Sequence, residues 1–220
     1  MHPSPPSPAR KRVRLAPAVR KQLILDAALA EFSTHGFGAT STETIAQRAG
    51  LSQAGLYAHF KSKEAILQAL FSDALLSEWS QWLSEDAPFT EARLDRLIDY
   101  WYQRVAEPRF LAVFRLLIAE STRLTEGVLR WRELVVDPFL AEQQRIVDSL
   151  VARGLMRDSA LSDHFQLAQS PLVFVMLMHL FDSGERKVLD QELNRMRESH
   201  RALLKQCLVL EPDHIPISPA

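Results

Sequence analysis

The most constraining stretch of this sequence is LSQAGLYAHF, residues 51–60, which follows Gly50 and precedes the segment KSK. It predicts a helix of roughly two turns, because Ser52 is a suitable N-cap and Gly50 supplies a left-handed turn before it. A helix this short is marginal alone, so it must be held against a larger body. Its outer face would present Gln53, Tyr57 and His59, which are side chains suited to a DNA major groove.

The preceding residues predict two further helices. The first begins at Pro17 and ends near His35 at Gly36, and one face carries apolar side chains at helical spacing, namely Ile24, Ala27, Ala28 and Phe32. The second runs through Ala49 and opens on a predicted capping box of Thr40 with Glu43. Small Ala46 and Gly50 allow two helices to cross closely, so the segment predicts a helix-turn-helix.

Lys63 lies in the first turn of the next predicted helix, which Ser62 caps. The helix dipole opposes a cation at this place, so a purely structural interpretation does not favour a lysine. A phosphate bound there would satisfy both the lysine and the free backbone N–H groups. We therefore expect Lys63 and His59 to have a functional role.

The charge is distributed unevenly between the two ends of the chain. The formal net charge of the 220 residues is −1, yet residues 1–70 carry +5 and the rest carries −6. This asymmetry indicates that only the N-terminal part meets a polyanion. The Pro- and Ser-rich, then basic, residues 1–16 predict a disordered arm, either a solubilising tail or a DNA contact.

Residues 20–67 resemble the DNA-binding domain of the TetR family (TetR/AcrR-like) of bacterial transcriptional regulators. The matching segments are ILDAA at 24–28, Phe32, GF at 36–37, TST at 40–42, IA at 45–46, AGLS at 49–52, LYAHF at 56–60 and KE at 63–64. The combination IA-x-x-AG followed by LY-x-HF-x-x-KE is far more specific than a generic helix-turn-helix. The resemblance covers about a quarter of the chain.

The resemblance implies an all-α homodimer with an N-terminal three-helix helix-turn-helix domain at 17–66 and a helical ligand-binding and dimerisation domain at 67–210. The three prolines of residues 211–220 predict a flexible tail. It implies binding to a palindromic operator, usually as a repressor released by a small-molecule effector; an activator of the same fold is the alternative. Carried over by position, the DNA contacts are Thr42, Gln53, Ala54, Tyr57, His59 and Lys63. Gln53 suits an adenine edge, while Tyr57, His59 and Lys63 suit phosphates.

The remainder predicts further helices. The helix after Ser62 continues to Trp82, others span 91–105 and 126–136, and one begins at Pro108. Asp137-Pro138 resembles an N-cap followed by Pro at the first position, and it starts or kinks a helix that ends before Gly154. Several large apolar side chains here are candidates for lining an effector pocket, although aromatic residues at helical spacing are more often core. These candidates are Trp101, Phe110, Phe114, Trp131, Phe139 and Met178.

The last two predicted helices carry a dimerisation signal. Residues 172–181 are apolar on nearly all sides, and a heptad-like stripe follows Gly184 and extends to Cys207. Such a pair of helices suits a two-fold four-helix bundle, with packing inside one chain as the alternative. The candidate interface residues are Leu172, Phe181, Leu189, Leu193, Met196, His200 and Leu203.

Other classes of function lack sequence support. The seven histidines show no pair at ligand spacing and Cys207 is the single cysteine, so we expect no metal site, no cofactor and no enzyme activity. No secretory signal or membrane-length apolar run appears, which predicts a cytoplasmic protein with no membrane partner. A helical interaction protein that does not bind DNA would leave four residues unexplained, namely Gln53, Tyr57, His59 and Lys63.

Overall fold

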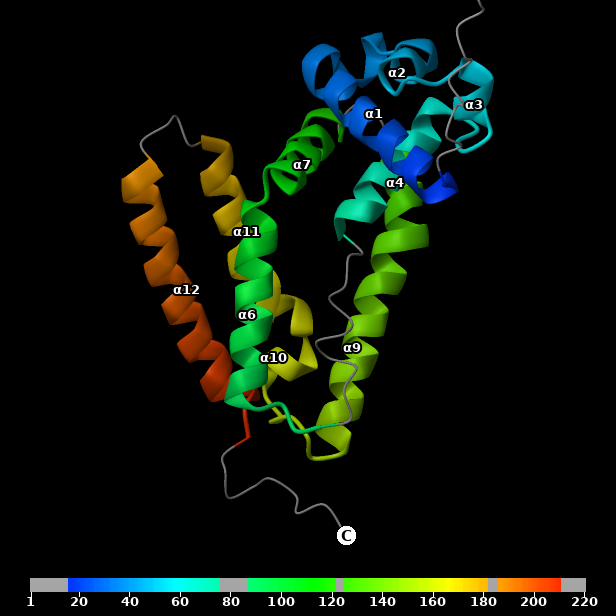
Figure 1. Cartoon of the computed structure of the whole chain (residues 1–220). Helices are drawn as coiled ribbons and strands as arrows, with labels where there is room; N and C mark the ends of the chain where they lie inside the picture. The colour runs from blue at the N-terminus through cyan, green and yellow to red at the C-terminus, as the bar shows by residue number, and fades with distance from the viewer. Residues whose placement is uncertain (1–15, 76–86, 122–124, 182–185, 211–220) are drawn as a thin grey trace, which may run out of the picture. The chain divides into compact units, whose positions relative to one another are not determined.

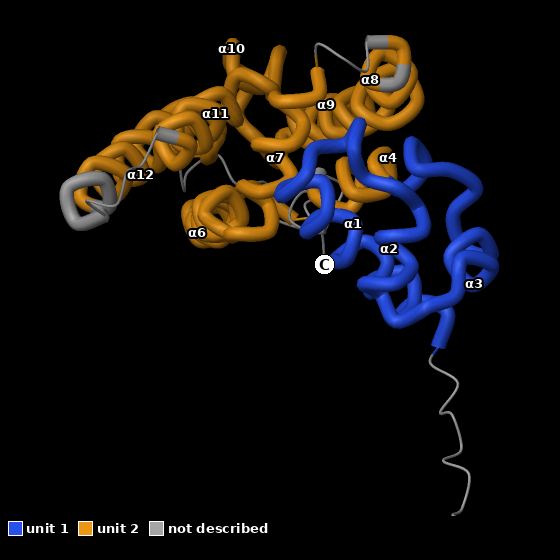
Figure 2. The backbone as a smooth tube through the Cα atoms, turned by 90° about the horizontal axis from the view of Figure 1, so that it is seen from above, with its two compact units in different colours: residues 1–66 blue, residues 67–220 orange. Residues whose placement is uncertain are grey.

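The computed structural model describes residues 16–75, 87–121, 125–181 and 186–210. The secondary structure in these ranges is helical (Figure 1), which confirms the predicted all-α class. Two compact units divide the chain, residues 1–66 and 67–220 (Figure 2). The predicted basic arm up to residue 15, the helix continuation to Trp82 and the tail at 211–220 lie outside the described residues. Among the helices described, none is long and apolar enough to cross a membrane.

The first unit contains α1 (Pro17–Ala39), α2 (Thr42–Arg48), α3 (Gln53–Tyr57) and the beginning of α4 (Lys63–Leu75). Pro17 opens α1 as predicted, and the apolar face of this helix is buried, with Ile24 and Ala28 fully inaccessible. Gly36 leaves helical geometry at φ 77°, as expected for a helix end, but Phe37–Ala39 then add a further turn.

The turn between α2 and α3 follows from local sequence. Gly50 adopts φ 68°, its N–H donates to Gln47 O at 3.1 Å, and Leu51 N–H donates to Ala46 O at 2.9 Å. These two bonds satisfy carbonyls that the end of a helix leaves open. Ser52 caps α3 by accepting from the Gly55 N–H at 3.1 Å, as predicted. The helix itself is shorter than expected and ends at Tyr57.

The predicted capping box of α2 is displaced by one residue. Ser41 Oγ accepts from Thr44 N–H at 3.1 Å, and Ser41 N–H donates to Thr44 Oγ1 at 3.2 Å. Thr40 is instead buried, and its hydroxyl donates to Gly36 O at 2.9 Å. The prediction of Thr40 with Glu43 was wrong because the Thr40 side chain is used to close the turn after Gly36.

Lys63 also closes this turn, which its sequence position did not reveal. Its ammonium donates to three carbonyl oxygens, those of Phe37 at 2.6 Å, Thr40 at 2.7 Å and Gly38 at 3.4 Å. It also lies 4.4 Å from the centroid of the Phe37 ring. A cation at the C-terminal end of α1 is favoured by the dipole of that helix, which offsets the unfavourable dipole of α4. Lys63 therefore has a structural reason for its place.

The second unit packs around α6 (Glu91–Ala106), which contacts α7 (Pro108–Glu120), α11 (Phe165–Phe181) and α12 (Arg186–Leu208). The remaining elements are α8 (Thr125–Trp131), a π-helix η1 (Arg132–Val136), α9 (Asp137–Ala152) and α10 (Ala160–Asp163). The core includes fully buried side chains from α6, α9, α11 and α12, namely Leu94, Leu97, Val147, Phe165 and Leu204.

α9 begins at Asp137, but it follows η1 without a break, so Asp137-Pro138 lies inside a continuous helical stretch and Asp137 is not an N-cap. Asp137 has helical geometry, φ −62° and ψ −44°, and its N–H donates to Arg132 O five residues earlier. Pro138 has no N–H to donate, so an uninterrupted α-helix would lose a bond here. Instead, the π-helical turn η1 joins α8 to α9 without a break, as π-bulges do inside longer helices.

The heptad-like stripe of α12 faces mostly into its own unit, which supports the alternative of packing inside one chain. Leu193, Met196 and Cys207 pack against the core, and His200 is buried. Leu172 of α11 is buried as well, whereas Leu203 is 48% exposed. The side chains of Phe181 and Leu189 lie outside the described part of the structure. The buried residues are not available to a second protomer in this arrangement.

His200 joins three helices. Its Nε2 lies 2.8 Å from Ala168 O of α11, and its Nδ1 lies 3.3 Å from the Tyr102 hydroxyl of α6. A carbonyl only accepts, so Nε2 carries the proton and Nδ1 accepts from Tyr102. Burial lowers the pKa of His200 and raises the pKa of Tyr102 to about 12, so both groups are held neutral.

Replacing Lys63 by methionine should destabilise the first unit. The substitution leaves three carbonyls without their donor, and we expect the free energy of unfolding to fall by about 2 kcal/mol. Lys61→Met, at an exposed position two residues earlier, should change it by less than about 0.5 kcal/mol. Chemical denaturation followed by circular dichroism measures both. Equal stability of the two variants would contradict the structural role of Lys63.

His200 should make stability depend on pH. Because its pKa is lowered in the folded protein, the unfolded chain binds the proton more readily. The free energy of unfolding should therefore decrease as pH falls below about 6.5, by up to about 1.4 kcal/mol per pH unit, and this contribution should be constant above that pH. His200→Gln should lack this part of the slope in denaturation curves at pH 5 to 8. An unchanged slope in that variant would exclude His200 as its source.

Candidate nucleic-acid interface and internal cavity

The exposed side of α3 brings together three of the residues predicted to contact DNA. Gln53 and Ala54 are exposed, and Tyr57 is 46% exposed although it is a large aromatic side chain. Leu56, on the opposite side of the helix, is completely buried and anchors α3. Gln53 and Tyr57 are four residues apart, so both point from the same face.

Thr42 extends this surface from α2. Its hydroxyl lies 3.1 Å from the hydroxyl of Tyr57, which links the first residue of α2 to the last residue of α3. The link orients both side chains at the surface, and each hydroxyl retains capacity for a phosphate oxygen.

His59 and Lys63 differ from the other four predicted DNA contacts in their position and in the bonds they already make. His59 follows the end of α3 and is half-buried. Lys63 is also half-buried, and its three N–H groups already face three carbonyls. The prediction that Lys63 clamps a phosphate is therefore weakened, because DNA would have to compete with bonds inside the domain.

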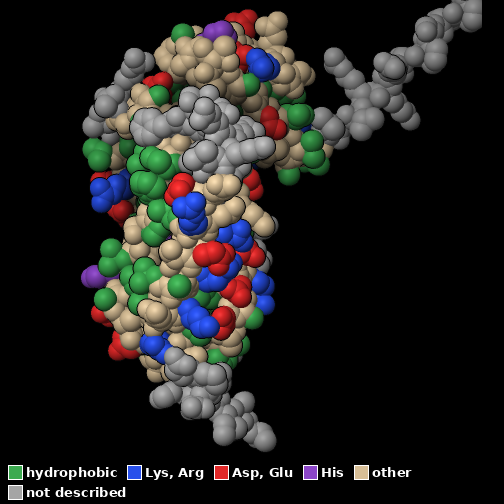
Figure 3. Space-filling model, turned by 90° about the vertical axis from the view of Figure 1, so that its left-hand side faces the viewer, with side chains coloured by type: hydrophobic (Ala, Val, Ile, Leu, Met, Phe, Trp, Pro, Cys, Tyr) green, Lys and Arg blue, Asp and Glu red, His purple; other side chains and the backbone are tan. Residues whose placement is uncertain are grey.

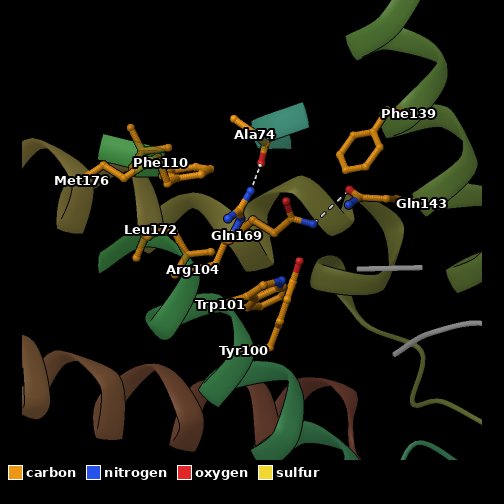
Figure 4. Close-up of a pocket in the computed structure, with 12 residues that line it drawn as sticks. Ala74, Tyr100, Trp101, Arg104, Phe110, Phe139, Gln143, Gln169, Leu172 and Met176 are labelled. Carbon is orange, nitrogen blue, oxygen red and sulfur yellow. Dashed lines mark hydrogen bonds between the residues drawn. The ribbon is translucent and has the colours of Figure 1, made fainter. Parts of the chain in front are cut away.

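A cavity of about 230 Å³ lies in the second unit, and Figure 4 shows the residues that line it. Five helices supply its wall, which is mainly aromatic and aliphatic. The lining residues are Ala74 of α4, Tyr100, Trp101, Arg104 and Val105 of α6, Phe110 of α7, Phe139 and Gln143 of α9, and Gln169, Leu172, Val173 and Met176 of α11. Such an apolar concave site with a few polar groups is typical of small-molecule sites.

Three of the six predicted pocket residues line this cavity: Trp101, Phe110 and Phe139. Trp131 is buried elsewhere, where its ring packs at 5.3 Å from that of Phe71 and its indole N–H donates to Ser72 Oγ at 3.3 Å. Phe114 is partly buried against the core, and Met178 is also partly buried, but neither is among the lining residues. Periodicity alone did not separate the cavity wall from the core.

The polar residues of the cavity were missed at the sequence level. Gln169 Nε2 donates to the buried Gln143 Oε1 at 3.0 Å, and Arg104 Nη2 donates to Ala74 O at 3.1 Å and Asp73 O at 3.4 Å (Figure 4). Arg104 and Gln143 lie at helical spacing from buried apolar residues. Arg104 is three residues after Trp101, and Gln143 is four residues before Val147. A polar residue on a predicted buried face was the available signal.

The outer surface of α11 and α12 is partly apolar (Figure 3). Leu167, Val173 and Phe174 of α11 and Leu203 of α12 are all between 48% and 52% exposed. In the side view, hydrophobic side chains gather in a band beside intermixed acidic and basic ones. Monomeric proteins rarely expose contiguous patches of this kind without a function.

Known proteins match the chain in two ways. Residues 24–70 match the family described as "Bacterial regulatory proteins, tetR family". The HTH-type transcriptional regulator RutR of Escherichia coli strain K12 is 45% identical over 65 residues, which are 30% of this chain and 30% of RutR. The matched stretch thus spans less than a third of that relative.

Solved structures match over most of the chain. One is the structure of the "putative TetR-family transcriptional regulator" from Mesorhizobium loti MAFF303099. It superposes with a TM-score of 0.63 and 25% sequence identity, over 90% of this chain and 100% of that chain. The SmeT–triclosan complex superposes with a TM-score of 0.66 and 20% identity over 92% of this chain and 98% of that one. The second likeness concerns the fold alone.

The family match over residues 24–70 covers the helix-turn-helix, and the superposed structures extend the likeness to the larger helical unit. Residues 24–70 are thus a helix-turn-helix of the TetR type, and the chain has the fold of a TetR-family transcriptional regulator.

Proposed function

We propose that the chain acts as a homodimeric repressor in the cytoplasm, where it binds a palindromic operator and is released by a small-molecule effector. The observation that carries this proposal is the pairing, in one chain, of an exposed α3 face with an apolar cavity. Each protomer would place α3 in a major groove, with the two copies about 34 Å apart on one face of the duplex.

Gln53 is the proposed base reader. Its amide is exposed at the first position of α3, and a glutamine amide matches the N6 and N7 groups of adenine. Ala54 beside it is small enough to permit close approach and contact with a thymine methyl group. Thr42 and Tyr57 are proposed as phosphate contacts that set the register of the helix. We keep His59 and Lys63 as weaker candidates.

The exposed band of α11 and α12 is the proposed dimer surface. The sequence-based candidate Leu203 stays in this set, and the structure favours adding Leu167 and Phe174. Leu172 and His200 would support the surface from inside rather than touch the partner. A two-fold arrangement would bury each band against its copy.

The cavity is the proposed effector site. A ligand there would bind one arrangement of the protomers better than another and shift the population away from the DNA-bound one. SmeT, which has the same fold, was solved as a complex with triclosan. That fact supports a small-molecule site in this fold without identifying the ligand of this chain.

Gln53→Ala should relax base preference at one position in each half-site. Loss of the bidentate hydrogen bonds of the amide should reduce the free-energy difference between the right and the wrong base by roughly 1–3 kcal/mol. The measurement is operator affinity on the DNA upstream of the coding sequence and on single-base variants, at two salt concentrations. Wild-type affinity should decrease with salt and exceed affinity for random duplex.

Gln47→Ala is the matched control, because Gln47 is an exposed glutamine on α2 outside the α3 face. It should leave base preference unchanged. If Gln53→Ala also leaves base preference unchanged, Gln53 is not the reader. If the wild-type dimer shows no DNA binding at either salt concentration, the regulator proposal fails. Transcription from the bound promoter with purified polymerase then distinguishes repression from activation.

Phe174→Glu should weaken dimerisation at least tenfold, because it places a charge in a desolvated interface. Sedimentation equilibrium over a range of protein concentrations measures this effect. Leu134→Glu is the control, since Leu134 is 66% exposed on η1 and lies outside the α11–α12 surface. A variant with Phe174→Glu that remains as dimeric as the wild type would rule out this surface.

A further inference from the structure

We propose that the cavity takes a compact, neutral molecule that carries a hydrogen-bond donor beside an acceptor, as a lactam does, and that the side-chain amide of Gln169 recognises both groups. The inference rests on the proposed function, because it names the ligand class of the effector site. It follows from the pairing of Gln169 with Gln143, from the bonding capacity of an amide and from the apolar wall around the pair.

Two glutamines from different helices meet in the wall of the cavity. Gln143 of α9 is 2% exposed, and Gln169 of α11 is half-buried. Figure 4 shows the two side chains pointing toward each other, and Gln169 Nε2 donates to Gln143 Oε1 at 3.0 Å. Within the part of the chain that the structure describes, neither amide has a second hydrogen bond. A buried partner thus holds the Gln169 amide at one point, and its other polar groups remain available at the cavity wall.

The bonding capacity of Gln169 does not depend on which amide of the pair is the donor. A primary amide has two N–H groups and a carbonyl oxygen with two lone pairs. When Gln169 donates to Gln143, one N–H and the carbonyl oxygen of Gln169 remain. If both amides are turned over, Gln169 accepts instead and keeps two N–H groups and one lone pair. In either case Gln169 offers a donor and an acceptor on one planar group.

The neighbouring Gln144 shows how a glutamine is bonded when its role is structural. Its Nε2 donates to Asp148 Oδ1 at 2.7 Å and to Ser162 O at 2.6 Å, and its Oε1 accepts from Phe165 N–H at 2.9 Å. Both ends of that amide are satisfied inside the protein, as is usual for polar groups away from water. The Gln169 amide has the same capacity but a single bond, so a ligand with matching groups would complete it.

A donor and an acceptor are both required of that ligand. A ketone or a carboxylate supplies acceptors alone and leaves the Gln169 carbonyl without a donor, which is costly in a site closed to water. An amine without a carbonyl leaves the N–H groups without an acceptor. A carboxylate would also lose its hydration, because Arg104, the charged residue of the lining, already pairs with Glu107. A lactam or secondary amide satisfies both sides of Gln169 without a charge.

The rest of the wall limits the size of the ligand and favours a ring. Trp101, Phe110 and Phe139 supply aromatic surfaces, and Leu172 and Met176 supply aliphatic ones (Figure 4). Aromatic rings pack well against other planar groups. The volume of about 230 Å³ is below the roughly 300–1,000 Å³ of sites that hold drug-sized ligands. We therefore expect a molecule of one or two rings.

Three probes of nearly equal size and shape test this ligand class by isothermal titration calorimetry, at a pH where all three are neutral. The lactam 3,4-dihydroquinolin-2(1H)-one has both groups. In 2-tetralone a methylene replaces the N–H, and in 1,2,3,4-tetrahydroquinoline a methylene replaces the C=O. The lactam should bind the wild type roughly 5-fold to 100-fold more tightly than either of the others, the range expected when a buried polar group loses its partner.

Substitutions of Gln169 should change this preference in two different ways. Gln169→Met removes both polar groups, so the preference for the lactam over either other probe should fall to threefold or less. Gln169→Glu keeps the size of the side chain but has acceptors alone when ionised. It should keep the preference over 2-tetralone and lose the preference over tetrahydroquinoline. The glutamate variant separates the two halves of the recognition and serves if the methionine variant is unstable.

Gln166→Met is the matched control. Gln166 is a half-buried glutamine of the same helix, and its Nε2 donates to Leu140 O of α9 at 3.5 Å, but it lies outside the cavity lining. This variant should keep the full preference for the lactam.

Three results would overturn the inference. Equal binding of the lactam and one of the other probes to the wild type excludes recognition of the group that distinguishes them. A full preference that persists in Gln169→Met excludes Gln169 as the residue that reads the ligand. Binding of none of the probes up to their solubility limits excludes the ligand class.

Operator affinity, measured in parallel, tests the proposed function separately. The ligand-free wild type should bind the operator, and the lactam at saturation should lower that affinity. Lactam binding with the predicted preference but with unchanged operator affinity would support the ligand class of the cavity and contradict its role as an effector site.

Discussion

A helix of five residues does not persist in water unless other parts of the protein hold it. The proposed DNA-reading surface therefore depends on the contacts that fix α3, Gln53–Tyr57. The left-handed Gly50 sets its direction, Ser52 accepts from the free N–H of Gly55, and fully buried Leu56 anchors it. With α3 fixed in this way, Gln53 can project to solvent without an additional support.

The turn between α1 and α2 requires a second support, which comes from far along the chain. Lys63 reaches back to the carbonyls of Phe37, Gly38 and Thr40, and Arg48 of α2 pairs with Glu31 of α1 at 2.8 Å. The first residue of α4 is therefore part of the architecture of the helix-turn-helix. Because α4 continues to Leu75, where Arg104 holds its last turn, one helix is fixed at both ends by cations that bond to carbonyls.

In the second unit, α6 combines three tasks on different faces. Tyr102 packs into the core against His200, Trp101 and Arg104 line the cavity, and Asp95 and Asp99 pair with Arg201 of α12 at 2.9 and 3.2 Å. The proposed effector site and α12, which is part of the proposed dimer surface, thus both contact α6. A ligand that shifts α6 would act on α12 through contacts that are already made.

The sequence by itself determined the features that depend on a few neighbouring residues. The all-α class, the start of α1 at Pro17, the turn at Gly50 and the N-cap at Ser52 follow from backbone preferences that act over one helical turn. Only the tertiary structure decided which polar groups meet across longer separations. It placed Lys63 on the end of α1, Arg104 in the cavity wall and His200 in the core. Helical periodicity shows that a residue lies on a buried face, but the identity of its neighbours depends on how the helices pack.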